Sequence, residues 1–394
     1  MVNTPGYALP LLGNLKKQGH NVSILVREMP DFEQEFVKSD IDKVYSDYNV
    51  FKATDVDSAL NFLREFKADL FLTDLTMPRS DKFARQVHRL AKLSTKVLEM
   101  DNRATEILAY CRKEWKYNAQ YSIYPHQKLV GYSKMALLNF LNKITLERFG
   151  SKPRHLVHEF HSDIITVKGN WWKEQLDPFF RGSERKKIKV AGSLRYDYIK
   201  EISKNKIDYE KLGLDSKKET ILICPTKESP EWGNTYYNKR LFSMVKIIDK
   251  NFDFNIVIKL HPNDILNSRS YKFDYFSDID VSFCSVEDFY PLLRKSKLVI
   301  SQFSSVGLES SIFKVPHLFF DSFTRKGRMD HLYLQEGMKI GHGFNKKNLC
   351  MTIEDVLNED IKFNFNNYNK NVLNNVDGKS HLNISKQINN LLQK

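Results

Sequence analysis

A histidine, a pair of serines and a glutamate stand where they could bind an anionic ligand. His261 and Pro262 follow the apolar run FNIVIKL, which predicts a buried β-strand ending at the histidine. Another apolar run, KLVISQ, leads to Ser304 and Ser305, which begin a helical pattern that carries Glu309. A helix start offers free N–H groups and a positive dipole end to an anion. We therefore expect the serines and His261 to contact phosphate, and Glu309, one turn deeper, to contact a ribose hydroxyl.

Two further residues beside these strand ends are weaker candidates for the same ligand. Asn263 follows the His-Pro pair, and Lys227 follows the apolar run TILICPT. A lysine at a strand end could neutralise phosphate, although most loop lysines are simply solvated. The His-Pro-Asn sequence is also typical of an ordinary turn, because proline restricts φ and asparagine favours tight bends. A binding role and a turn both stay open for this stretch.

The first half of the chain contains the candidates for a general base. His126 ends the strand pattern AQYSIYPHQ, and imidazole is suited to proton transfer because it titrates near neutral pH. Asp74, Glu159 and Asp163 are the carboxylate alternatives. Asp74 belongs to the strand pattern ADLFLTDL, and strand ends of parallel sheets face the ligand crevice. The sequence leaves all four residues open as catalytic groups.

Two acidic patterns resemble metal sites. The stretch ADLFLTDLTMPRSD resembles the phosphoacceptor strand of a response-regulator receiver, but a receiver also needs an acidic pair after its first strand, and MVNTPGY contains none. The DID sequence at Asp278–Asp280 has the letters of a DxD motif, yet it precedes a short strand pattern instead of closing one. We expect no metal and no cofactor, because lysine, histidine and helix ends can neutralise phosphate.

The elements that must position these residues alternate between strand and helix patterns. In the first half, strand patterns at 22–26, 68–75, 96–100 and 119–127 alternate with helical ones. The second half repeats this order, with strand patterns at 164–167, 188–191, 220–226, 254–261, 297–302 and 316–321. Such alternation is typical of doubly wound parallel sheets. The expected fold is α/β, with two Rossmann-like domains facing a central cleft.

The length of 394 residues exceeds one ordinary core, which favours two domains. The stretch 203–218 is polar and rich in Lys and Asp, as linkers often are. We expect residues 1–200 to form an N-terminal acceptor-binding domain. Residues 201–394 are expected to form a C-terminal domain that binds the nucleotide donor and ends in a closing amphipathic helix.

The composition favours an anionic partner. The chain carries 61 Lys and Arg against 48 Asp and Glu, a formal charge of +13 that is spread along the sequence. This balance suits a nucleotide, a phosphorylated polymer or an anionic membrane surface. No motif for nucleic-acid binding accompanies the charge, so we expect no nucleic-acid partner. The four cysteines are far apart and no apolar run of about 18 residues occurs, which favours a cytoplasmic protein loosely attached to the inner face of the plasma membrane.

The sequence resembles the bacterial transferases of cell-surface polysaccharide and teichoic acid that have the GT-B fold. It is similar above all to CDP-glycerol glycerophosphotransferases, and more distantly to bacterial sialyltransferases and capsule Kdo transferases. In these enzymes a strand-ending His-Pro and a serine pair hold the phosphate of a cytidine nucleotide, matching His261-Pro262 and Ser304-Ser305. SDIITVKGNWWKEQL and VAGSLRYDYI also resemble the family's interdomain stretch, although Leu194 replaces a proline. The family's catalytic His-Gly pair is matched only by His126-Gln127.

The resemblance implies an inverting, metal-independent transferase. Its donor would be a CMP- or CDP-linked sugar or polyol phosphate, and its acceptor a glycan or lipid-linked glycan of the cell envelope. Two alternatives remain open: an enzyme similar to UDP-N-acetylglucosamine 2-epimerase, which shares the fold, and a non-catalytic protein that binds sugar nucleotides.

Overall fold

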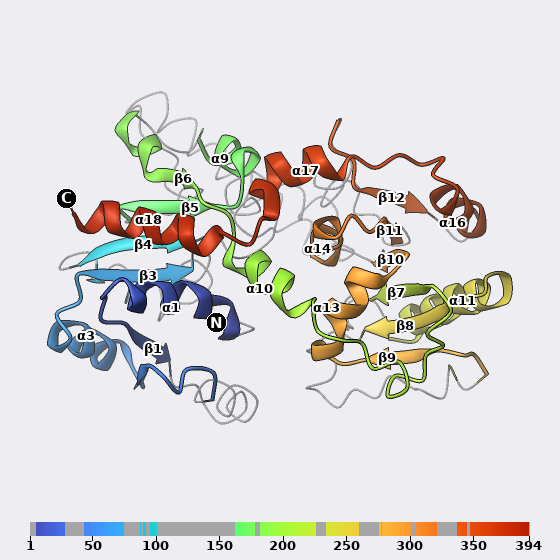
Figure 1. Ribbon diagram of the computed structural model, residues 1–394, viewed down its shortest axis with the longest axis horizontal. Coiled ribbons are helices and arrows are strands. Elements are labelled where there is room, and N and C mark those ends of the chain that lie inside the picture. Colours follow the sequence, from blue (N-terminus) through green and yellow to red (C-terminus); the bar gives the residue numbers. More distant parts are fainter. Residues whose placement is uncertain are drawn as a thin grey trace, which may run out of the picture. The chain divides into compact units, whose positions relative to one another are not determined.

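The computed structural model describes residues 5–27, 43–74, 87, 90–91, 95–100, 162–177, 182–225, 234–259, 276, 278–301, 305–320, 337–344 and 347–393. The chain divides into two compact units (Figure 1). Unit 1 comprises Met1–Tyr198 together with Asn371–Lys394, and unit 2 comprises Ile199–Lys370. Helix α10 (Leu194–Ile202) carries the chain from unit 1 into unit 2, and α17 (Phe365–Val372) carries it back.

Unit 1 contains parallel strands in two groups. Four strands are hydrogen-bonded in sequence order: β3 (Leu70–Asp74), β4 (Lys96–Met100), β5 (Ile164–Val167) and β6 (Ile188–Val190). A separate parallel pair consists of β1 (Ser23–Arg27) and β2 (Asn49–Ala53). Strand β5 is buried at every position, as expected for a parallel strand covered on both faces.

The helices of unit 1 cover these strands with apolar stripes. They are α1 (Leu9–Lys17), α3 (Val56–Glu65), α9 (Asn170–Leu176) and α18 (Ser380–Leu392), with 3-10 turns at Pro5–Ala8, Gly182–Lys187 and Asn374–Val376. Helix α3 begins at Asp55, whose carboxylate accepts a hydrogen bond from Ser58 N in a capping box. Helices α1 and α18 lie side by side (Figure 1).

The C-terminal helix differs from the sequence-based division into 1–200 and 201–394. An amphipathic helix does form at the C-terminus, but its stripe Ile384, Ile388 and Leu391 packs with residues of α1 and with Leu98 and Ile164 of the sheet in unit 1. The apolar spacing of a helix predicts that one face is buried, not which sheet buries it. Residues 371–394 therefore belong with the N-terminal unit.

The described residues of unit 2 form a six-stranded sheet in which each pair of neighbouring strands is parallel. The strands, in spatial order, are β12 (Gly341–Phe344), β11 (His317–Phe320), β10 (Leu298–Ser301), β7 (Thr220–Cys224), β8 (Asn255–Lys259) and β9 (Ser282–Cys284). Its other helices are α11 (Asn234–Asn251), α13 (Val286–Lys295), α14 (Val306–Ile312) and α16 (Leu349–Leu357). The predicted α/β class with parallel sheets is confirmed.

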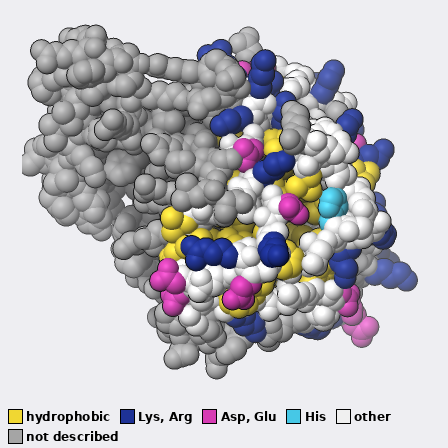
Figure 2. Space-filling view, turned by 90° about the vertical axis from the view of Figure 1, so that its left-hand side faces the viewer, with side chains coloured by type: hydrophobic (Ala, Val, Ile, Leu, Met, Phe, Trp, Pro, Cys, Tyr) yellow, Lys and Arg dark blue, Asp and Glu magenta, His cyan; other side chains and the backbone are white. Residues whose placement is uncertain are grey.

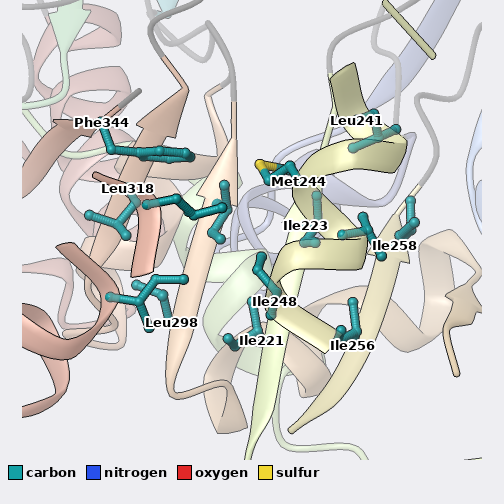
Figure 3. Packing of buried hydrophobic residues seen from close by; sticks show 14 of the residues in the cluster. Ile221, Ile223, Leu241, Met244, Ile248, Ile256, Ile258, Leu298, Leu318 and Phe344 are labelled. Atoms are coloured by element: carbon teal, nitrogen blue, oxygen red, sulfur yellow. The ribbon is translucent and has the colours of Figure 1, made fainter. Parts of the chain in front are cut away.

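The two faces of this sheet are covered by different helices. On one face, Ile221 and Ile223 of β7 and Ile256 and Ile258 of β8 form a core with α11 and α16. Figure 3 shows Met244 of α11 among these side chains. Because successive side chains of a strand alternate between faces, Cys224 and Lys259 point to the other face. Helices α13 and α14 contact the sheet there.

Candidate donor-binding site

The strand order of unit 2 creates a topological switch point between β7 and β10. From β7 the chain adds β8 and β9 on one side, then crosses to β10 and adds β11 and β12 on the other. Open parallel sheets bind ligands beyond the carboxyl ends of their strands at such a point, because the following loops diverge there. Cys224 and Ser301, the last residues of β7 and β10, are register partners, so these two loops begin side by side.

The loops that start at this point contain several of the predicted ligand-binding residues. Lys227 follows β7 by three residues, and Ser304 follows β10 by the same distance. His261 lies two residues beyond Lys259, the end of the neighbouring strand β8. Lys227 and Ser304 lie outside the described residues, as does the stretch from His261 through Pro262 to Asn263. Their contacts with a ligand stay predictions.

The structure brings Ser305 and Glu309 together. Ser305 is the N-cap residue of α14, but its Oγ accepts no capping hydrogen bond from a backbone N–H of the helix. This Oγ donates a hydrogen bond to Glu309 Oε1 at 3.3 Å. Glu309 is only 1% exposed, so its carboxylate is held inside the unit and not on a solvated helix face. Burial of a carboxylate is costly unless it is hydrogen-bonded. The serine and the carboxylate therefore form one polar group at the start of α14.

The last residues of four strands form a row across the sheet. Ser301 is paired in register with Cys224, and Lys259 is paired with Cys284. The residues before Cys224 and Lys259, which are Ile223 and Ile258, are also paired with each other. Burial raises the pKa of the Cys284 thiol to about 12 and also raises that of Cys224, while the nearby charge of Lys259 opposes both shifts. These thiols therefore stay protonated at neutral pH.

A buried hydrogen bond fixes the strand that leads to the serine pair. Ser301 Oγ lies 2.7 Å from His317 Nε2, and the two residues are 2% and 0% exposed. Burial lowers the pKa of His317 to about 3, so its imidazole is neutral at physiological pH. The bond ties β10 to β11 immediately before the loop of Ser304. Sequence reasoning missed this pair, although two polar residues inside apolar strand patterns are a detectable signal.

The two described candidates for the general base lie at opposite edges of one sheet in unit 1. Asp74 is the last residue of β3 and so stands at the carboxyl edge of its parallel sheet. Asp163 precedes β5 at the opposite edge, where its Oδ2 accepts a hydrogen bond from Val97 N at 2.9 Å. Because ligands bind beyond the carboxyl edge of a parallel sheet, the strand-end position of Asp74 makes it a better candidate than Asp163. His126 and Glu159 lie outside the described residues.

Two negative findings apply to the described residues only. Among them, no group of three or more His, Cys, Asp or Glu side chains is arranged to hold a metal ion. The helices formed by these residues are all too short or too polar to span a membrane. Asp278 and Asp280 of the DID sequence are both exposed, and they lie before β9.

Solved structures share this fold at low sequence identity. A protein assigned as a UDP-N-acetylglucosamine 2-epimerase from Listeria monocytogenes matches with a TM-score of 0.62 and 15% identity over 98% of this chain and 92% of its own. The wall teichoic acid polymerase TagF matches with a TM-score of 0.55 and 15% identity over 100% and 98% of the two chains. A TagF variant soaked with CDPG matches with a TM-score of 0.52 and 15% identity over the same shares.

At this identity the structural matches establish the GT-B type of fold and do not distinguish an epimerase from a transferase. No match was found among curated proteins. The family model of CDP-glycerol:poly(glycerophosphate) glycerophosphotransferase, however, matches residues 146–385. This match is more than half of the chain and includes the switch point, the His261-Pro262 pair and both serines. The chain belongs to the CDP-glycerol:poly(glycerophosphate) glycerophosphotransferase family, and it is a transferase that uses a nucleotide-activated donor.

Proposed function

We propose that this transferase moves glycerol phosphate, or a closely similar polyol or sugar phosphate, from a cytidine-nucleotide donor to a cell-envelope polymer. The observation that carries the proposal is the switch point of unit 2. The family match spans it, and the loops that begin there contain the serine pair and Lys227. The TagF variant soaked with CDPG, which shares the fold, supports a cytidine diphosphate donor.

The proposed reaction is a phosphoryl transfer. An acceptor hydroxyl attacks the phosphorus that bears the glycerol, its new O–P bond forms, and the bond to the bridging oxygen breaks so that CMP leaves. A base, His126 or Asp74, accepts the hydroxyl proton. His261, Ser304 and Ser305 hold the phosphates and stabilise the charge that develops on the leaving group. Unit 2 is thus the donor-binding part, and unit 1 supplies the acceptor site and the base.

The proposed donor is tested by thermal unfolding in the presence of CMP, CDP, UDP or GDP. A ligand present at about 100 times its dissociation constant stabilises a protein by about 2.7 kcal/mol. We expect the cytidine nucleotides to raise the unfolding temperature most. Stabilisation by UDP alone would favour the epimerase alternative, and no stabilisation by any nucleotide would contradict a nucleotide site.

The proposed reaction is tested by product analysis. Incubation with CDP-glycerol and an oligomeric glycerol phosphate acceptor should release CMP and lengthen the acceptor by one glycerol phosphate, as mass spectrometry detects. Conversion of UDP-N-acetylglucosamine to its 2-epimer, without transfer, would identify an epimerase. Binding of CDP-glycerol without any turnover across a panel of polyol phosphate and glycan acceptors would identify a non-catalytic binding protein.

We also propose loose attachment to anionic membranes, where a lipid-linked acceptor would be found. The formal charge of +13 supports this, and Figure 2 shows Lys and Arg side chains spread over the described part of the face in view. Such attachment weakens with salt, because ions screen exposed charges beyond about 10 Å at 0.1 M. Cosedimentation with phosphatidylglycerol vesicles should fall between 50 and about 300 mM salt, and vesicles of phosphatidylcholine alone are the control. Equal recovery with both lipids would contradict this attachment.

A further inference from the structure

Lys259 is the last residue of β8 and lies in the row of strand ends beside the switch point. Lys259 is paired in register with Cys284 of β9. On its other side lies Cys224 of β7, because the preceding residues Ile258 and Ile223 are register partners. Residues paired across parallel strands point to the same face. The side chain of Lys259 therefore lies on the face that also bears Cys224 and its partner Ser301, at the edge from which the ligand loops depart.

The Lys259 ammonium lies over an aromatic ring and close to two uncharged thiols. Its Nζ lies 4.7 Å from the centroid of the Phe289 ring, and Phe289 is 1% exposed on α13. The charge of Lys259 also acts on the thiols of Cys224 and Cys284, which burial keeps protonated, and these thiols in turn lie near the carboxylates of Glu309 and Asp288. Within the described part of the chain, no carboxylate lies within ion-pair distance of this ammonium. A half-buried cation with an aromatic ring beneath it is thus placed to accept an external anion.

Other described lysines of unit 2 have a different environment. Lys218 and Lys297 pair with Asp253 and Glu219, and these pairs are on the exposed surface. Such pairs contribute little to stability and show no sign of a ligand. Lys259 differs because it ends an otherwise buried strand, and the strand next to it, β7, borders the switch point. Adjacent strands are only about 4.8 Å apart, a distance that an extended lysine side chain spans.

We propose that Lys259 is a further donor-binding residue, whose ammonium contacts the pyrophosphate of the nucleotide donor. The proposal rests on the proposed function, since it takes the donor to be a nucleoside diphosphate derivative. The ring of Phe289, which lies beneath the ammonium, would hold the end of the lysine side chain in place, so that little freedom is lost when the phosphates bind.

The test compares the binding of CDP and of cytidine by isothermal titration calorimetry. A charge-assisted hydrogen bond to phosphate predicts that Lys259→Met binds CDP about 10- to 100-fold more weakly, while its affinity for cytidine is unchanged. Lys259→Gln is measured in parallel as a polar variant, in case methionine impairs folding. The matched control is Lys246→Met, because Lys246 Nζ also lies over an aromatic ring, at 5.7 Å from Phe242, but is exposed on α11.

The outcomes separate this proposal from the proposed function. If the wild-type protein binds CDP and both Lys259 variants bind it equally well, Lys259 is not a donor-binding residue and the proposed function stands. An equal loss of affinity for CDP and cytidine would also overturn the proposal, because it would indicate a distorted pocket. If the wild-type protein itself binds no CDP, the proposed function fails first and this proposal fails with it.

Discussion

The carboxylate of Asp197 holds His381, which is 184 residues further along the chain. Asp197 Oδ2 accepts a hydrogen bond from the backbone N–H of His381 at 2.9 Å and lies 3.0 Å from its Nδ1. Asn383 Nδ2 also donates to the carbonyl oxygen of Ala191. The segment VAGSLRYDYI, which resembles the family's interdomain stretch, therefore forms hydrogen bonds with the first turn of α18. Its aspartate has a structural role in unit 1.

Replacement of Asp197 by alanine should destabilise the protein. The Asp197 side chain is 4% exposed, and its loss leaves two donors of His381 without their partner. We expect the free energy of unfolding to fall by about 1–3 kcal/mol in urea denaturation. Glu201→Gln is the control, because it breaks the exposed ion pair with Lys204 and should cost less than about 1 kcal/mol. Equal effects of the two variants would contradict this role of Asp197.

Replacement of Gly192 by alanine should loosen α18. Gly192 has φ +88°, and a Cβ there would lie 2.9 Å from Ser380 Cβ and closer still to its Oγ. Gly213→Ala is the matched control, because Gly213 also has positive φ, at +65°, but its added Cβ would meet Ser282 Oγ only at 3.8 Å. Backbone strain of about 1–2 kcal/mol applies to both variants, and the clash to Gly192→Ala alone. Limited proteolysis should cleave the C-terminal segment faster in Gly192→Ala; equal cleavage rates would contradict the predicted clash.

His261 and Ser305 should act on the same phosphate. If both contact it, His261→Ala and Ser305→Ala should each weaken CDP binding, by about 1.5–3 kcal/mol for the histidine, without loss of the fold. The double variant should lose less than the sum of the two single losses, because both groups serve one anion. Calorimetry of the four proteins measures this coupling. Unchanged affinity in His261→Ala would indicate that the His-Pro-Asn sequence is only a turn.

The general base should affect turnover and not donor binding. His126→Ala is expected to lower kcat by about 10²–10⁴-fold with CDP affinity nearly unchanged. Asp74→Asn, Glu159→Gln and Asp163→Asn are measured beside it. Asp163→Asn should leave turnover nearly unchanged, because the Asp163 side chain lies at the amino edge of the sheet and accepts a hydrogen bond from Val97 N that an asparagine oxygen can also accept. Normal turnover in His126→Ala would transfer the role to a carboxylate, with Asp74 the best placed.

The buried histidine of unit 2 should make stability depend on pH. Burial lowers the pKa of His317 from 6.5 to about 3, so below pH 6.5 the unfolded chain takes up a proton that the folded chain does not. Above pH 6.5 this difference in pKa therefore does not change the free energy of unfolding. As the pH falls from 6.5 toward 3, it lowers the free energy of unfolding progressively, by at most about 1.4 kcal/mol per pH unit. His317→Gln should flatten the pH dependence of unfolding between pH 6.5 and 4.5. A constant difference from the wild type at every pH would show that His317 does not titrate on unfolding.

Much of the fold was predictable because its signals are local. Apolar runs bounded by turn residues predict strands such as β7 and β10 wherever they lie in the chain, and their alternation with helical patterns predicts a parallel α/β sheet. The same local patterns identified the family through His261-Pro262 and Ser304-Ser305, and the family match confirmed it. Side chains at strand ends could be proposed as ligands for the same reason.

The sequence by itself therefore determined the class of the fold, the family and the segments that carry the candidate site. Only the tertiary structure decided which distant segments meet: α18 packs on unit 1 through Ile384 and Ile388, and His317 bonds Ser301 across two strands. It also decided that Lys259 stands in a row with Cys224 and Cys284. Apolar spacing specifies that a face must be buried, but the partner of that face and the register of neighbouring strands are set by side-chain packing over the whole unit.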